Sequence, residues 1–438
     1  MLAKYFQLDK YPEYNTAILR HNLANHFYEG TIFLFATSFI SVNTVLPVFI
    51  QSIGGNAIAI GSVTVLWTLG LNLPQLFFIR LFKRRDKIKP GVMKYGLIYR
   101  LNFILISFVC SVFLGKMDSR YSVPLMLFLI FTAATYGSSS GLFWYDFFSK
   151  TTPIVFRGRL LAIRLFLGSA LGILGGSAVS IILSSIIYPH NFALLFLICF
   201  FLTMVSFYFI SRLIEPAVPE ESGSRKTFQT APVPLKEIFS SSKKILKENL
   251  NFKNFLVADA LTLMSLTASA FYPVYAIKKF GLPASYAGAF TIILMASQVL
   301  GNFLFGYLAD FFGHKVNLLI LAASSAAASL VAVLANNVLL YGVAVFFFTG
   351  CTLTLQGISR LAIVVEMCTE SERPFYIGLF NSVTAPTILF GVIGGLLITI
   401  IGYVHVFFIY TLISLAAFFW LYKRVKEPRN LKIGQNNL

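Results

Sequence analysis

A few ionisable side chains interrupt the long apolar stretches of this sequence. The acids and arginines concerned are Glu29, Arg100, Asp146, Asp259, Arg360 and Glu366. A charged side chain at the centre of a lipid bilayer costs about 3 kcal/mol on insertion scales, so a chain keeps one there for a structural ion pair or for function. These residues are therefore the first candidates for binding a substrate or a coupling ion.

Asp259 and Arg360 are the most informative of these candidates. Asp259 lies about 9 Å beyond Lys253 at the rise of an α-helix, which is too deep for an interfacial charge. Polar residues share the face of each predicted helix, namely Thr262, Ser265 and Ser269 after Asp259, and Thr352 and Gln356 before Arg360. Two interpretations stay open: a structural ion pair between the two helices, or a site that handles substrate or protons.

The remaining candidates fall on other apolar stretches. Arg100 has few partners nearby in the sequence, and we expect a structural pair with a group on the first or the fourth span, with substrate contact as the alternative. Asn43 adjoins a face of threonines and serines in the first span, which Glu29 opens. Tyr145 and Asp146 follow a run of serines in the fourth. Hydroxyl and aromatic groups of this kind suit a neutral or amphiphilic ligand, although serines in a span commonly bond their own backbone.

The composition identifies the medium in which these side chains lie. Of the 438 residues, 57% are hydrophobic and only 12% are charged, which is too little polar surface for a soluble globule. Apolar runs of about 20 residues, the length of a transmembrane helix, recur along the chain. The predicted spans are about 29–51, 57–81, 92–114, 123–148, 160–187, 192–214, 254–277, 285–309, 315–334, 338–365, 375–401 and 404–422. The chain is therefore an all-α integral membrane protein of twelve transmembrane helices.

Lysine and arginine orient these spans. They gather in alternate connections, and the net charge of +18 reflects this arrangement better than a nucleic-acid surface. We expect both termini in the cytoplasm and the protein in the cell membrane. The four cysteines form no CxxC pair, so we expect free thiols and no metal site or other cofactor. No nucleotide-binding loop or catalytic constellation is present in the sequence, which indicates a protein that is not an enzyme.

The two halves of the sequence carry a weak internal repeat. Leu46-Pro47-Val48-Phe49 in the first span matches Tyr272-Pro273-Val274-Tyr275 in the seventh, and Gly61-x-x-Thr64 then matches Gly288-x-x-Thr291. Repeats of this kind are typical of transporters. Gly172-x-x-Gly175-Gly176 is echoed by Gly391-x-x-Gly394-Gly395. Small residues let helices approach closely in lipid, so we interpret both glycine clusters as packing rather than gating elements.

A short glycine-bounded turn joins the eighth and ninth predicted spans. It contains Gly306-Tyr307-Leu308-Ala309-Asp310, then Gly313 and Lys315. We expect Asp310 at the start of a helix, where an acid favours the positive end of the helix dipole, and close backbone approach at Gly306 and Gly313. The turn resembles the loop motif of the major facilitator superfamily, G-x-L-A-D-R-x-G-R-K. Phe311 and His314 stand where that motif has arginines.

This resemblance implies two pseudo-symmetric six-helix bundles that rock about a central site, with helices 1, 4, 7 and 10 lining the cavity. The expected parts are a cytoplasmic amphipathic arm (1–28), an N-terminal bundle (29–214), a cytoplasmic linker (215–252), a C-terminal bundle (253–422) and a cytoplasmic basic tail (423–438). The loop residues Gly306, Asp310, Gly313 and Lys315 are then candidates for a conformational switch.

The function that follows is secondary active transport, which we expect to be proton-coupled export of a small or lipophilic compound. The glycines at Gly172–Gly176 resemble the superfamily's antiporter motif in position, but they lack its proline. Uptake of a sugar or other metabolite, and a non-transporting receptor or regulator on the same scaffold, are the alternatives. A membrane-embedded transferase is disfavoured because the predicted external loops are short. The expected partners are a small-molecule substrate, a coupling proton and the lipid bilayer, with no nucleic acid, and the protein is expected to be a monomer.

Overall fold

The computed structural model describes residues 5–6, 8–11, 16–79, 87–216, 245–369 and 372–430. Most of the predicted linker, the end of the basic tail and the arginine and lysine run that follows the second span lie outside these residues. The first half of the chain forms α2 (Ala17–Ser38), α3 (Val45–Ser52), α4 (Ala57–Ile79), α5 (Lys89–Val112), α6 (Ser119–Thr151), α7 (Ile154–Ser185) and α8 (His190–Arg212). The second half forms α10 (Leu250–Leu266), α11 (Tyr272–Phe280), α12 (Tyr286–Phe312), α13 (His314–Leu334), α14 (Val338–Glu366), α15 (Arg373–Thr384) and α16 (Phe390–Arg424), with the short 3-10 helices η4 (Thr267–Ala270) and η5 (Ala385–Leu389). A further 3-10 helix, η1 (Leu8–Lys10), precedes α2.

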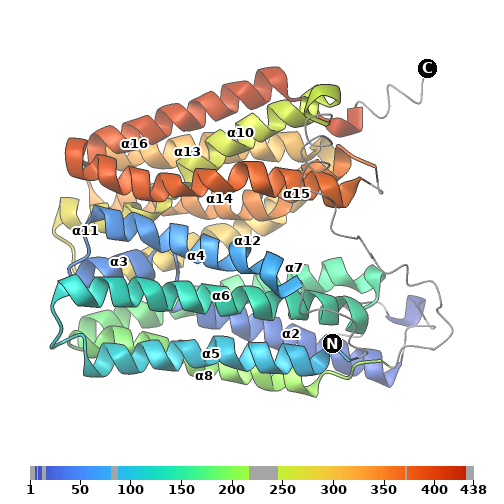
Figure 1. Ribbon diagram of the computed structural model, residues 1–438, viewed down its shortest axis with the longest axis horizontal. Helices are drawn as coiled ribbons and strands as arrows, with labels where there is room; N and C mark the ends of the chain where they lie inside the picture. The colour runs from blue at the N-terminus through green and yellow to red at the C-terminus, as the bar shows by residue number, and fades with distance from the viewer. Residues whose placement is uncertain are drawn as a thin grey trace.

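These helices form two bundles that lie one above the other in Figure 1, α2 to α8 below and α10 to α16 above. Among the described residues, eight helices are long and apolar enough to cross a membrane, or nine if the bent pair α10 and α11 is one span. One of these long segments contains both α15 and α16. Within it, α16 is interrupted at Gly402, where φ is 81°. Dividing it there and adding α4 and the pair α2 and α3 completes the architecture of twelve spans.

The first helix of each bundle is broken, which the sequence analysis did not anticipate. The predicted span 29–51 consists of α2 and α3, and the predicted span 254–277 consists of α10, η4 and α11. Pro47 lies near the start of α3 and Pro273 near the start of α11. Proline removes a backbone donor and clashes with the preceding turn, so it favours a break where these prolines stand. The matched Leu-Pro-Val-Phe and Tyr-Pro-Val-Tyr segments thus mark equivalent breaks.

The first helix also begins earlier than the predicted span. α2 begins at Ala17, capped by the Thr16 hydroxyl, and so it includes much of the stretch assigned to the arm. Ahead of it, Phe6 and Leu8 are buried against Phe148 and Phe156 at the ends of α6 and α7. Burial of these apolar side chains anchors the described part of the arm to the N-terminal bundle.

The bundles meet mainly at one end of the molecule, the end that carries α3 and α11 at the left of Figure 1. One hydrophobic cluster there draws residues from both bundles, among them Phe49, Phe271 and Phe290. At the opposite end each bundle has clusters of its own, around Phe255 in one and around Phe147 in the other. The hydrophobic contact between the bundles is therefore concentrated at one end of the helices.

Glycines make the closest of these contacts. Gly176 of α7 lies against Gly288 and Ile292 of α12, and Gly395 of α16 lies against Ala57 of α4. A methyl group at Gly176 would stand 2.8 Å from the Ile292 backbone nitrogen and 2.9 Å from the Gly288 carbonyl oxygen. Both glycine clusters therefore pack helices against each other, as the sequence predicts, and they do so across the bundle interface.

Candidate functional site

Asp259 and Arg360 meet between α10 and α14. Arg360 Nε donates to both carboxylate oxygens of Asp259, at 2.9 and 3.1 Å, and Arg360 Nη2 donates to Oδ2 at 2.9 Å. Arg360 Nη2 also donates to the Thr384 hydroxyl, and the guanidinium lies 4.5 Å from the centre of the Phe380 ring of α15. The pair envisaged from the sequence is thus present, in the forked geometry that gives the strongest contact between these groups.

The two partners differ in exposure. The side chain of Asp259 is 3% exposed, whereas that of Arg360 is 22% exposed. Gln356 and Arg360 border a small pocket together with Asp259 and Thr262, and its other walls are mainly leucines. The arginine is therefore the accessible member of the pair, and the wall around it is apolar.

Most of the described polar side chains that follow Asp259 along α10 make hydrogen bonds within the C-terminal bundle. Thr262 bonds the Ala258 carbonyl, and Ser265 bonds Ser325 within the C-terminal bundle. Ser269, at the break between α10 and α11, instead donates to Asn43 Oδ1 across the bundle interface at 3.0 Å. Thr44 and Thr291 make a second contact across it, at 2.6 Å between hydroxyl oxygens. The two breaks therefore face each other, and the hydrogen bond to Asn43 links the two bundles at the end that carries α3 and α11.

The N-terminal bundle holds an ion pair that the sequence analysis missed. Arg164 Nη2 donates to Glu29 Oε2 at 2.6 Å, and both side chains are less than 10% exposed. The Arg164 guanidinium lies 4.7 Å from the centre of the Trp144 ring and against Gly30. Arg164 lies within α7 and is buried inside the bundle. Its place four residues into the predicted span was the available signal.

Arg100 makes no direct ion pair among the described residues, although Glu29 of the first span lies close enough to act on it electrostatically. Its Nε donates to the Thr203 carbonyl and its Nη1 to the Gly96 carbonyl, both at 2.7 Å. The Phe207 ring packs on its guanidinium, with 4.8 Å between Arg100 Cζ and the centre of the ring. Backbone carbonyls can satisfy a buried guanidinium because it only donates hydrogen bonds. The other candidates of this bundle, Tyr145 and Asp146, are exposed on α6.

The loop between α12 and α13 is a single residue, Gly313, with φ of 83°. Asp310 therefore lies in the last turn of α12, and the prediction that it begins a helix is wrong. Its side chain is exposed, and within the described part of the chain its carboxylate has no hydrogen bond. Gly313 needs its glycine, because its φ is left-handed and Glu427 fills the adjacent space, but nothing lies within 4 Å of a methyl placed at Gly306.

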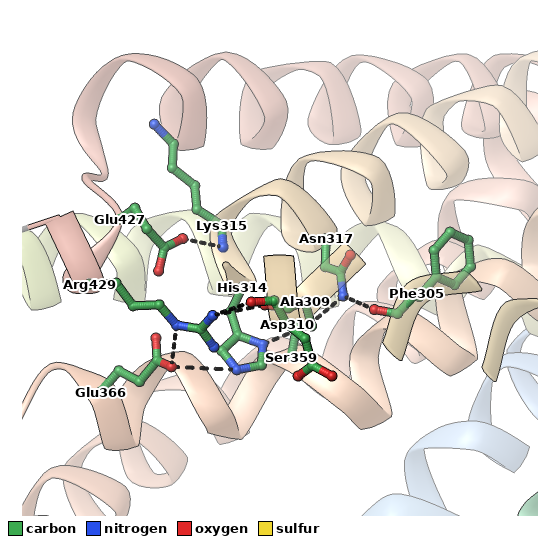
Figure 2. A network of polar contacts seen from close by, with 10 residues as sticks. All are labelled: Phe305, Ala309, Asp310, His314, Lys315, Asn317, Ser359, Glu366, Glu427 and Arg429. Atoms are coloured by element: carbon green, nitrogen blue, oxygen red, sulfur yellow. Dashed lines mark hydrogen bonds and ion pairs between the residues drawn. The ribbon is translucent and has the colours of Figure 1, made fainter. Parts of the chain in front are cut away.

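An acid from the C-terminal segment takes the capping position that was predicted for Asp310. Glu427 Oε2 accepts from the Lys315 backbone N–H at 2.8 Å, as Figure 2 shows. The N-terminal bundle has the same arrangement, since Glu215 accepts from the Ile88 and Lys89 N–H groups at the start of α5. Arg212-Leu213-Ile214-Glu215-Pro216 and Arg424-Val425-Lys426-Glu427-Pro428 share the pattern R-x-x-E-P, a repeat that sequence reasoning overlooked.

The described residues offer no metal site: they contain no group of three or more histidine, cysteine or acidic side chains that could hold an ion. The four cysteines are buried free thiols.

Comparison with known proteins agrees with the architecture. The family model described as Major Facilitator Superfamily matches residues 255–437. The chain has the major facilitator superfamily fold. This result confirms the resemblance first seen in the loop at Gly306–Lys315. None of the curated proteins compared with the chain matches it.

Solved structures match nearly the whole chain at low identity. A mutant of the nucleoside transporter NupG has a TM-score of 0.68 at 16% identity, covering 92% of this chain and 100% of that one. A D-xylose-proton symporter has a TM-score of 0.68 at 14% identity, covering 94% and 99%. A bacterial homologue of the human lysosomal transporter Spinster, in an inward-facing and unoccupied conformation, has a TM-score of 0.63 at 12% identity, covering 93% and 97%. All of these proteins are transporters rather than enzymes, and the likeness to them concerns the fold.

Proposed function

We propose that this protein is a secondary active transporter that moves a small molecule by alternating access and couples the movement to protons at Asp259. The forked Asp259–Arg360 pair carries this proposal, because it joins α10 to α14 beside a pocket and exposes only its arginine. A proton on Asp259 would cancel the charge that holds Arg360, so proton binding and separation of the two helices are linked.

The division into an arm, two bundles, a linker and a tail, both termini in the cytoplasm, residence in the cell membrane and a monomeric state all belong to this proposal. With that orientation, α3 and α11 lie at the external face. The hydrogen bonds from Asn43 to Ser269 and from Thr44 to Thr291 then close the external side, and the structure faces the cytoplasm. Rocking of the bundles would break these contacts and form new ones at the other end.

The loop residues Gly306, Asp310, Gly313 and Lys315 form the switch in this proposal. In the described conformation the Asp310 carboxylate is exposed at the negative end of α12, which is an unfavourable place for an acid. We expect it to gain a partner when the cytoplasmic side closes. Asp310→Ala should therefore lower the population of the outward-facing state, measured by the reactivity of a cysteine placed at Asn43; an unchanged reactivity would remove Asp310 from the switch.

The wall of the pocket supports one class of substrate. A ring of leucines around Gln356 and Arg360 suits a small compound with an apolar body and a polar group. We propose export of such a compound, supported by the position of the glycines at Gly172–Gly176. Proton-coupled uptake of a sugar or nucleoside is the second candidate, favoured by the xylose symporter and NupG among the similar folds. Glu29, Arg100, Tyr145, Asp146 and Asn43 are secondary candidates for substrate contact.

The experiment uses purified protein in liposomes of known orientation. Compounds that raise the melting temperature are first selected as ligands, and their transport is then measured with and without a pH gradient. Asp259→Asn should abolish accumulation against a gradient and spare downhill exchange, whereas Glu372→Gln, which removes an acid from the turn between α14 and α15, should change neither.

Accumulation that persists in Asp259→Asn with its pH dependence intact would exclude Asp259 as the proton site. The direction of accumulation separates export from uptake. Ligand binding without any transport by the wild-type protein would favour the receptor.

A further inference from the structure

The loop motif that this chain resembles has an arginine where His314 stands, and the structure shows what occupies the place of that guanidinium. His314 Nδ1 bonds the Ser359 hydroxyl, and its Nε2 lies 3.7 Å from Glu366 Oε1 at the end of α14. The histidine thus points at the acid without making a short contact with it. A longer, forked side chain at position 314 would reach that carboxylate.

Arg429 reaches it instead, from the segment that follows α16. Its Nε donates to Glu366 Oε1 at 2.9 Å, and its Nη1 donates to the carbonyls of Ala309 and Asp310 at 3.0 and 3.1 Å. Figure 2 shows Arg429 between Glu366 and the end of α12, beside His314. One guanidinium therefore ties the ends of α12 and α14 together and places a positive charge at the negative end of the α12 dipole.

The same site has unused acceptors. Glu366 Oε2 and Glu427 Oε1 are buried without a hydrogen-bond partner among the described residues. A buried carboxylate oxygen left unpaired is costly, so the surroundings of His314 are suited to more positive charge than they hold. These two unpaired oxygens lie next to position 314, where the motif has its second arginine.

We propose that Arg429 is a positioning residue that substitutes for the arginine missing at position 314, so that the C-terminal segment is a working part of the loop between α12 and α13. With Glu427 at the start of α13 and Arg429 at the end of α12, this segment holds both sides of the Gly313 turn. The inference concerns the loop itself and does not depend on the direction or the coupling of transport.

The test is hydrogen exchange of the Lys315 amide in the purified full-length protein, without substrate. Arg429→Ala should free the segment that carries Glu427 and make this amide exchange about fivefold faster, the size expected when a partly exposed charge leaves a helix terminus. Lys426→Ala is the matched control, because it removes an exposed cation from the same segment, and it should leave the exchange unchanged.

The decisive variant restores the arginine at its motif position. Arg429→Ala combined with His314→Arg should return the exchange to within about twofold of wild type, because the new guanidinium can bind the unpaired oxygens of both Glu366 and Glu427 and so hold Glu427 at the Lys315 amide. The proposal is overturned if the double variant exchanges as fast as Arg429→Ala, or if Arg429→Ala behaves like Lys426→Ala. Should Arg429→Ala not fold, the rescue is measured on Arg429→Lys, whose compact ammonium cannot reproduce the forked contacts.

Discussion

Each bundle buries an acid from its first helix against an arginine, but the two pairs differ in accessibility. Glu29 and Arg164 are both enclosed, with Trp144 and Gly30 packed around the guanidinium. In the C-terminal bundle Asp259 is enclosed, but Arg360 borders a pocket. A charge that stays buried can only be paired, whereas one that reaches water can separate from its partner and return. This difference supports the proposal that the C-terminal pair, rather than the N-terminal pair, is the one that responds to ligand or proton.

The largest expected effect is loss of the enclosed pair. Glu29→Ala leaves Arg164 buried and uncompensated, which should cost about 3–5 kcal/mol of stability. Asp259→Ala should cost only about 1–2 kcal/mol, because Arg360 can be hydrated. Denaturant melts of the two variants in the same detergent check this order. An equal or larger cost for Asp259→Ala would refute the structural distinction between the pairs.

The next largest effect on stability is expected from a substitution at the interface between the bundles. A methyl group at Gly288 would overlap the Gly176 carbonyl and the Ser180 backbone nitrogen, and neither can move independently of α7. Gly288→Ala should therefore force the two bundles apart at the α3 and α11 end, at a cost of about 1–3 kcal/mol for overpacking.

Thiol labelling of a cysteine placed at Asn43 detects this opening. The control is Gly357→Ala on α14, where nothing lies within 4 Å of the added methyl. Unchanged labelling in Gly288→Ala would show that the glycine contact does not hold the bundles together.

The smallest expected effect on stability comes from the acids of the two R-x-x-E-P segments, Glu215 and Glu427. Burial tends to raise the pKa of Glu215, but hydrogen bonds from the Ile88 N–H, Lys150 and the Lys89 N–H outweigh it and lower that pKa below its ordinary value near 4.5. The stabilisation is thus fully present above pH 4.5 and is lost as the pH falls through the lowered pKa. Glu215→Gln should reduce stability by about 1 kcal/mol at pH 7.

Melting temperatures of wild type and Glu215→Gln, measured from pH 7 downward, should converge in acid. Parallel curves at every pH would show that the Glu215 charge does not carry the cap. Glu427→Gln at pH 7 should have a similar effect if the two ends are equivalent.

Hydropathy predicted the spans well because a bilayer imposes one length on every crossing helix. The helix starts were less predictable, because α2 and α7 begin at Ala17 and Ile154, before their apolar runs do. The breaks at Pro47 and Pro273 could have been inferred, since both prolines stand within predicted spans.

Spacing along the sequence brought Asp259 and Arg360 into consideration as a pair, because each lies on a polar helical face. Which backbone carbonyls satisfy Arg100, and which acid caps α13, depend on contacts between distant segments. The repeated R-x-x-E-P pattern was visible in the sequence, but its capping role required the fold. Asp310 was misplaced because a one-residue turn left it in the helix before Gly313.

If the Asp259–Arg360 pair responds to protons, the distance between the two bundles should change with pH. Gly158 of α7 and Gly378 of α15 have open space around them, so spin labels on cysteines placed there report this distance in a background without the native cysteines. Wild type should shift between two distance populations as the pH falls, and Asp259→Asn should show the low-pH population at every pH, whereas Glu372→Gln should behave as wild type. A pH response in Asp259→Asn equal to that of wild type would contradict the account.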